Sequence, residues 1–196
     1  MTSDLLAAYR AEVERRGGET GITGLYRTEE LDISDESGGL AVLHTAGFRA
    51  YSRGHGCHWA TLSYLCGTDD NGPWAVRVPG TITTVPAAQY WVTPAAVHKA
   101  LRTGWRVRRQ GDIYAIETRR QHDTASGWAG DDWRWHPAPD GYERVTSHFW
   151  DAETRYLKHR PADGRRHRPL KISWPVRFAQ QNVYGMGRGM GRGPGD

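Results

Sequence analysis

The segment Tyr64–Gly80, with the sequence YLCGTDDNGPWAVRVPG, predicts two β-strands joined by a tight turn. Its centre, TDDNG at Thr68–Gly72, consists of residues that favour turns. On either side lie runs of apolar, aromatic and β-branched residues, which are typical of strands. A turn sequence flanked in this way is a strong indication of an antiparallel hairpin.

Strand and helix patterns also precede this hairpin. Leu40–Gly54 and His58–Gly67 are short β-prone runs interrupted by glycine. Glu19–Gly39 is polar and acidic, and we expect it to be loop with one short element. Ser3–Gly18 is predicted to be the first helix, because Ser3 can cap it, apolar residues recur at helical spacing and two glycines end it.

Two further helices and a second hairpin are predicted in the middle of the chain. Thr84–Val92 begins with a threonine cap and has a proline in its first turn. In Thr93–Gly104 the first residue is the expected cap and the last is the expected terminator. Trp105–Thr118 then alternates on both sides of Gln110-Gly111, which is typical of a hairpin.

Together these patterns predict an α+β fold: a single domain of antiparallel β-hairpins with an N-terminal helix and a central helix pair. A chain of 196 residues suits one domain, which we expect to span residues 1–184. Residues 185–196, GMGRGMGRGPGD, repeat Gly-Met-Gly-Arg and cannot bury a core. We expect them to form a flexible tail.

Cellular location is inferred from what the sequence lacks. The only cysteines are Cys57 and Cys66, too few for a disulfide scaffold in a chain of this size. No window approaches the roughly 20 apolar residues of a membrane span, and the N-terminus does not resemble a signal peptide. We therefore expect a cytoplasmic protein with no membrane association, and we expect no cofactor.

The distribution of charge points to a polyanionic partner. Residues 1–96 contain 7 Lys and Arg against 11 Asp and Glu, a net charge of −4, whereas residues 97–196 contain 19 against 11, a net charge of +8. Arg155–Arg192 holds ten basic residues and a single acidic one, Asp163. Asymmetry of this kind usually marks a surface that faces nucleic acid.

The segment Arg155–Trp174, RYLKHRPADGRRHRPLKISW, is predicted to form a basic hairpin. Its strands are expected at Arg155–Arg160 and Arg165–Ser173, and its turn at Pro161–Gly164, where proline and Asp-Gly favour reversal of the chain. The arginines should be largely exposed, because burying many unpaired charges is costly. The residues expected to anchor the hairpin to the core are Leu157, Ile172 and Trp174.

Two pairings of these strands are open. A three-residue loop places His159 opposite His167, with Cβ atoms about 4.5–5.5 Å apart, close enough to share a metal ion. A four-residue loop pairs His159 with Arg166 and sends the two histidines to opposite faces. A metal site would also need a third ligand, with His148 or Asp163 as candidates. One alternative function is therefore a metal-assisted nuclease or hydrolase at His148, His159 and His167.

The main hypothesis is a nucleic-acid-binding accessory protein. Lysine and arginine interleaved with aromatic residues suit a nucleic-acid backbone, and the hairpin at Trp105–Thr118 adds a second basic strand. The residues expected to form the interface are Arg106, Arg108, Tyr156, Lys158, Arg160, Arg165, Arg166, Arg168, Lys171 and Trp174. The cations would contact phosphates, and the two aromatic residues would stack or pack beside them. The pattern does not separate RNA from DNA, and we expect binding that is independent of base sequence.

A tryptophan-rich loop supplies another alternative. Trp128–Trp135, WAGDDWRW, could contact a protein partner if it is exposed. Its adjacent carboxylates, Asp131 and Asp132, could bind a divalent cation. A protein-interaction module acting through this loop is therefore also possible.

Residues 60–182 resemble a group of uncharacterised proteins encoded by phages and bacterial mobile elements. The resemblance rests on an Arg-Gln-Gly-Asp strand at Arg109–Asp112, a histidine at His148, and a basic segment with His and Pro that leads into a tryptophan and an asparagine. Pro175 follows Trp174 where the group has histidine. The resemblance implies a genomic context and a shared fold, and no reaction.

A second resemblance concerns catalysis by cysteine. The order Cys57, Gly111-Asp112-Ile113 and His148 resembles that of cysteine- and histidine-dependent amidases, in which the cysteine opens a helix. It implies a cysteine hydrolase with Cys57 as nucleophile. This chain departs from the pattern, because the residues after Cys57 are β-prone.

Overall fold

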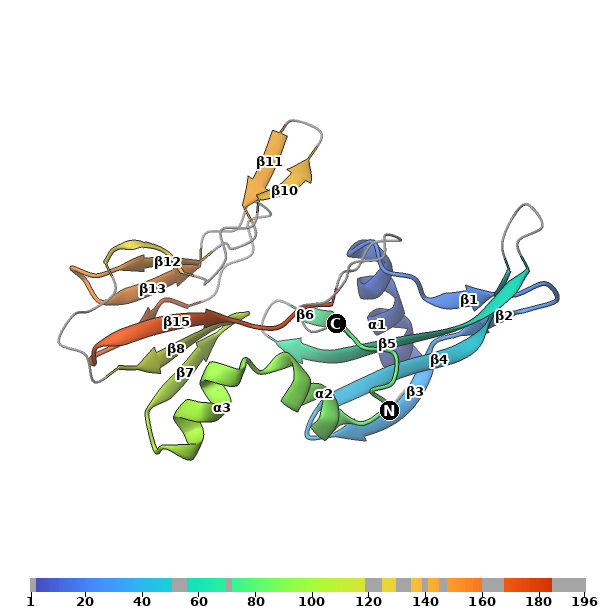
Figure 1. Ribbon diagram of the computed structural model, residues 1–196, viewed down its shortest axis with the longest axis horizontal. Coiled ribbons are helices and arrows are strands. Elements are labelled where there is room, and N and C mark those ends of the chain that lie inside the picture. Colours follow the sequence, from blue (N-terminus) through green and yellow to red (C-terminus); the bar gives the residue numbers. More distant parts are fainter. Residues whose placement is uncertain are drawn as a thin grey trace. The chain divides into compact units, whose positions relative to one another are not determined.

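The computed structural model describes residues 3–50, 56–69, 72–118, 125–129, 135–138, 141–144, 148–159 and 168–184 (Figure 1). It shows an α+β fold in which every strand pairing of the described residues is antiparallel. The predicted N-terminal helix and helix pair are present. The fold class is therefore confirmed.

The chain divides into two compact units. Unit 1 contains the described residues up to Val92 together with Val183 and Tyr184, and unit 2 contains those from Thr93 to Asn182. The boundary falls between the two helices of the predicted pair. The domain limits 1–184 stay a prediction, and the expected tail, residues 185–196, lies outside the described residues.

Unit 1 is built on a four-stranded sheet with the order β3-β4-β5-β6. The hairpin predicted from Tyr64–Gly80 is confirmed, because β5 and β6 pair from Ser63↔Val78 to Asp69↔Gly72. A separate two-stranded sheet joins β1 and β2. The bounds of these strands are β1 Gly21–Thr23, β2 Thr28–Glu30, β3 Asp32–Ser37, β4 Leu40–Ala50, β5 Cys57–Asp69 and β6 Gly72–Val78.

The expectation of loop with one short element at Glu19–Gly39 is wrong, because this segment forms β1, β2 and β3. The strand β3 is an edge strand that pairs only with β4 among the described residues. Its side chains are exposed or half-buried, so its sequence is polar and lacks a strong apolar alternation. Backbone hydrogen bonds to β4 hold it, and these leave no trace in side-chain hydrophobicity.

The two faces of this sheet pack on two different helices. On one face Leu43, Leu62 and Tyr64 contact a core that includes Tyr9 and Val13 of α1 (Ser3–Arg15). On the other face, the adjacent strand residues Val42 and Leu65 pack against α2 (Val85–Val92). Alternate strand residues thus serve opposite cores, as the two-residue period of a strand requires.

Tyr184 belongs to unit 1 although it follows unit 2 in the chain. Its ring lies 5.3 Å from the guanidinium of Arg77 on β6, and 6.3 Å from the ring of Trp91 on α2. Its backbone N–H donates a hydrogen bond to the Arg77 carbonyl at 3.4 Å. Unit 2 is therefore inserted between two parts of unit 1.

The described part of unit 2 contains one helix and two main sheets. The helix α3 (Ala95–Arg102) begins one residue later than predicted, because Pro94 rather than Thr93 occupies the N-cap position and no side chain caps it. One sheet has the order β15-β8-β7 and the other β14-β13-β12-β9, while β10 and β11 pair separately. The bounds are β7 Val107–Gln110, β8 Ile113–Glu117, β9 Gly127–Trp128, β10 Trp135–Ala138, β11 Gly141–Arg144, β12 His148–Asp151, β13 Tyr156–His159, β14 Leu170–Lys171 and β15 Val176–Gln180.

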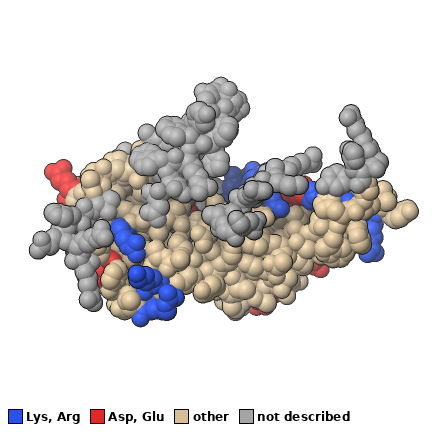
Figure 2. Space-filling model, viewed as in Figure 1, with Lys and Arg blue, Asp and Glu red and all other residues tan. Residues whose placement is uncertain are grey.

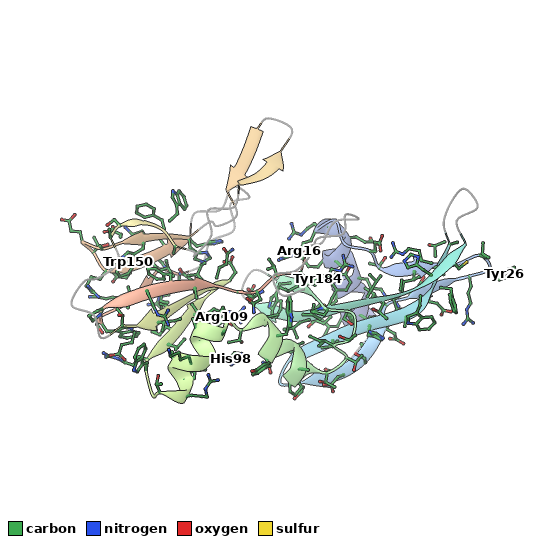
Figure 3. The ribbon with its side chains drawn as sticks, viewed as in Figure 1. Arg16, Tyr26, His98, Arg109, Trp150 and Tyr184 are labelled. Atoms are coloured by element: carbon green, nitrogen blue, oxygen red, sulfur yellow. The ribbon has the colours of Figure 1, made fainter. Side chains whose placement is uncertain are left out.

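The three-stranded sheet of unit 2 is covered on both faces. Tyr114, Ile116 and Ala179 pack against α3, whereas the opposite face packs against the four-stranded sheet. Trp150 is 1% exposed at the centre of this second contact, and its ring lies 5.4 Å from that of Phe178 (Figure 3). The predicted hairpin at Trp105–Thr118 is confirmed as β7 and β8, with the pairing Gln110↔Ile113 around the turn.

The basic segment pairs in a register that neither predicted loop gives. Tyr156 lies opposite Lys171 and Leu157 opposite Leu170, whereas His159 lies opposite His148 of β12. The three-residue loop would place Leu157 opposite Pro169, and the four-residue loop would place it opposite Arg168. The observed register instead brings Leu157 and Leu170 together on the buried face. The hydrophobic pairing therefore determines the register. The predicted turn, Pro161–Gly164, lies outside the described residues.

The predicted anchors of this segment are confirmed. Leu157 and Ile172 are fully buried, and Trp174 is 8% exposed. The expectation of exposed arginines is wrong for Arg155, which is half-buried and donates hydrogen bonds from its guanidinium to the carbonyls of Ile172 and Trp174. These bonds replace water around the charge, so its partial burial is tolerated.

Arg155 also has the only positive φ, 60°, of any non-glycine residue that the structure describes. We expect Arg155→Gly to lower the free energy of unfolding by about 1–3 kcal/mol through loss of the guanidinium hydrogen bonds. Arg155→Ala should lose the same bonds and also place an alanine, which has a Cβ atom, at the left-handed φ of 60°. It should therefore be less stable than Arg155→Gly by up to about 1 kcal/mol. Urea denaturation of both variants measures this, and an alanine variant at least as stable as the glycine variant would contradict it.

Candidate nucleic-acid interface

Two side chains of β7 are hydrogen-bonded to the segment Arg168–Lys171, which includes β14. The Arg108 side chain donates a hydrogen bond from Nη1 to the Lys171 carbonyl at 2.8 Å, and the Gln110 side-chain amide donates one to the Arg168 carbonyl. These bonds join strands that are about 60 residues apart in the sequence. We call Arg108, Arg168 and Lys171 the basic edge.

The positive charges of the basic edge are not neutralised by any carboxylate that the structure describes. All three residues are exposed, and none is in an ion pair with a described acidic residue. The Lys171 ammonium lies 5.8 Å from the centre of the Tyr156 ring. Figure 2 shows lysine and arginine side chains gathered over the part of unit 2 that contains β7 and the adjoining α3.

Two other predicted phosphate contacts are already in ion pairs. Arg106 binds Glu117 at 2.8 Å, and this carboxylate raises the pKa of Arg106. Lys158 binds Asp151 at 2.8 Å, and its hydrogen bond holds the pKa of Asp151 below the usual value. Exposed pairs of this kind contribute little to stability, but they reduce the positive charge available to a polyanion.

The remaining predicted residues fall into two groups. Tyr156 is half-buried beside Lys171, whereas Trp174 is buried and carries the Arg106 guanidinium 4.6 Å from its ring centre. Trp174 therefore packs beside a cation, one of the two roles expected for it. The other predicted contacts lie outside the described residues: Arg160, Arg165 and Arg166.

A buried histidine and an aspartate lie next to the basic edge. Asp112 follows Gly111, which has a φ of 56°, in the turn between β7 and β8. Its Oδ1 lies 3.2 Å from Nδ1 of His148, and its Oδ2 accepts a hydrogen bond from the Gln180 side chain at 2.8 Å. Burial acts to raise the pKa of Asp112, but His148 and Gln180 together hold it below its usual value.

His148 and His159 form a directly opposed pair, as they lie on neighbouring strands. Their ring centres are 4.6 Å apart, and the planes are tilted by 33°. His148 is only 1% exposed, so its ring cannot contact a substrate in this arrangement. It instead fixes the turn at Gly111-Asp112, and this turn positions Gln110 and the adjoining basic edge.

The structure gives limited support to the alternatives that involve catalysis. Among the residues it describes, no three His, Cys, Asp or Glu side chains are grouped so that they could hold a metal ion. The third predicted ligand, His167, and the carboxylates Asp131 and Asp132 lie outside the described residues. Cys57 is exposed and is the first residue of strand β5, so it does not open a helix.

Sequence reasoning missed the residues that organise the site. Gln110 is buried and links β7 to Arg168, while Arg109 donates a hydrogen bond to the buried side chain of Gln181 at 2.5 Å. The sequence gives no strong signal that Gln110, at an expected turn, is buried or that its side chain bonds to a distant segment. The Gly111-Asp112 pair was a recognisable feature, because it lies in the expected turn and in both family resemblances, but neither indicated its contact with His148.

No family model, no curated protein and no solved structure matches this chain. Within the described part of the chain, none of the helices has the length and apolar character needed to cross a membrane.

The interaction of Asp112 with His148 predicts a dependence of stability on pH. Because the pKa of Asp112 is lowered from 3.8, its ionised form stabilises the fold above that value, and this contribution is lost as the pH falls through the lowered pKa. We expect Asp112→Asn to be less stable than wild type at neutral pH, with a difference that shrinks below about pH 4. Urea denaturation between pH 7 and pH 2 measures this.

The control is Glu153→Gln, which removes an exposed carboxylate from the same unit. A difference between wild type and Asp112→Asn that stays constant over the whole pH range, or that Glu153→Gln reproduces, would contradict the prediction.

Proposed function

We propose that this protein binds nucleic acid through the basic edge of unit 2. The observation that carries the proposal is that two side-chain hydrogen bonds join Arg108 and Gln110 of β7 to the backbone at Lys171 and Arg168. The side chains of Arg108, Arg168 and Lys171 are exposed, and none has a described carboxylate as an ion-pair partner. A phosphate backbone presents closely spaced negative charges, and several cations on one strand edge can contact it together.

The wider charge distribution supports the same proposal. The net charge of +8 lies in residues 97–196, so the half that contains the basic edge carries the positive potential. Phosphate contacts contribute affinity without reading bases, and binding is therefore proposed to be independent of sequence. The resemblance to proteins of phages and mobile elements suggests an accessory role in nucleic-acid transactions there.

The position of the cations allows a test that leaves the fold intact. The hydrogen bonds at the basic edge are accepted by the backbone carbonyls of Arg168 and Lys171, so truncation of these two side chains does not remove an acceptor. The double variant Arg168→Ala/Lys171→Ala should fold as wild type does. Thermal unfolding monitored by circular dichroism checks this.

We expect the double variant to bind nucleic acid more weakly and with a smaller dependence on salt. Loss of two phosphate contacts should reduce the slope of log affinity against log salt by about 1.4–1.8. Fluorescence anisotropy with a labelled oligonucleotide at several salt concentrations measures both quantities.

The matched control is Arg102→Ala/Arg177→Ala, which removes the same charge at two exposed residues of unit 2 outside the basic edge. It should retain most of the affinity and the wild-type slope. Equal losses in the two double variants would mean that net charge, not the basic edge, determines binding. Wild-type binding that is insensitive to salt would contradict the proposed function.

A further inference from the structure

The four-stranded sheet of unit 2 carries a row of aromatic side chains on the face opposite the core. Trp150, Leu157 and Leu170 point into the core shared with the three-stranded sheet. Because successive strand residues point to opposite faces, their neighbours project from the other side. The aromatic residues on this side are Trp128 of β9, Phe149 of β12 and Tyr156 of β13, which we call the aromatic row.

The aromatic row runs diagonally across the sheet. Trp128 lies directly opposite Phe149, and their rings meet edge to face with centres 5.6 Å apart. Phe149 lies opposite Lys158, so Tyr156, two residues earlier on β13, is its diagonal neighbour at about 7–8 Å. All three side chains are half-buried, and each keeps part of its surface in solvent.

The row ends at the basic edge. Tyr156 lies opposite Lys171 of β14, and the Lys171 ammonium is 5.8 Å from the Tyr156 ring centre. Each of the four strands thus contributes one residue to a path of three rings and one cation. The carboxylate of Asp151 on β12 is the nearest negative charge to the aromatic row on that strand. It forms an ion pair with Lys158 at 2.8 Å, so this face presents little unpaired negative charge.

The outer face of an antiparallel sheet is normally polar, so a row of three partly exposed aromatic side chains is unusual there. Base stacking on aromatic side chains accepts any base, because every base has a π-face, and it works together with a basic groove that follows the phosphates. The neighbouring cations of the basic edge favour a polyanion over an apolar protein surface.

We propose that the nucleic acid bound by unit 2 is single-stranded. Its bases stack on Trp128, Phe149 and Tyr156, and its phosphates follow the basic edge. The inference rests on the proposed function and narrows it to one substrate class. In a duplex the base faces are already stacked on each other, so the aromatic row gives no contact to double-stranded nucleic acid.

The test compares two conservative variants with an aromatic control. Phe149→Leu and Tyr156→Leu keep an apolar side chain but remove the ring, and Tyr156→Phe keeps the ring and removes only the hydroxyl. Tyr90→Leu removes a ring that is 66% exposed on α2 of unit 1. Binding to a labelled single-stranded 20-mer and to the duplex of the same length, as RNA and as DNA, is measured by fluorescence anisotropy.

We expect wild type to bind the single strand more tightly than the duplex. Each leucine variant at the aromatic row should lose about tenfold in affinity for the single strand, while its salt slope stays at the wild-type value. Tyr156→Phe and Tyr90→Leu should bind as wild type does. Circular dichroism establishes that each variant is folded, and Tyr156→Leu decides the outcome where Phe149→Leu is unstable.

The outcomes separate this inference from the proposed function. Folded leucine variants with wild-type affinity, or a duplex bound as tightly as the single strand, would overturn the stacking proposal while the salt dependence of the basic edge still stands. Wild-type protein that binds neither strand at low salt would overturn both.

Discussion

The pairing of Leu157 with Leu170 is the constraint on which the arrangement of unit 2 depends. These two leucines face the core between its sheets, and Trp150 of the next strand lies on the same side. A shift by one residue would exchange the two faces of a strand. The charged and aromatic side chains between these core residues would then be buried, at a high cost for each unpaired charge. Burial of apolar side chains therefore selects the surface on which the cations and the aromatic row appear.

The sequence predicted those elements whose pattern is local. The turn TDDNG and the Gln110-Gly111 turn both lie where the structure has hairpins, since glycine and asparagine or aspartate favour reversal of the chain directly. The edge strand β3 escaped prediction because backbone pairing with β4 and polar side-chain contacts of Ser34 and Asp35 hold it in place. Neither kind of contact gives an apolar alternation in the sequence. The register of β13 and β14 escaped it too, because the turn residues allowed several loop lengths and the choice depended on a distant core.

The candidate site shows the same limit. Lysine and arginine could be counted from the sequence, but whether a cation is available depends on the strand opposite it. Glu117 neutralises Arg106 across the β7–β8 hairpin, and Asp151 neutralises Lys158 across β12 and β13. Arg168 and Lys171 instead accept the hydrogen bonds from β7 at their backbone carbonyls, and their side chains stay exposed. Pairing across strands thus reduces the charge that Arg106 and Lys158 can offer to a polyanion.

The insertion of unit 2 into unit 1 has a consequence for synthesis. The Arg77 side chain is made roughly a hundred residues before Tyr184, the aromatic residue that covers it. At the usual rate of translation this separation amounts to on the order of 5–20 s. During that interval the sheet of unit 1 can form, but its contact with Tyr184 cannot. The chain therefore completes its first unit last, because the contacts of Tyr184 with Arg77 and Trp91 can form only after unit 2 has been synthesised.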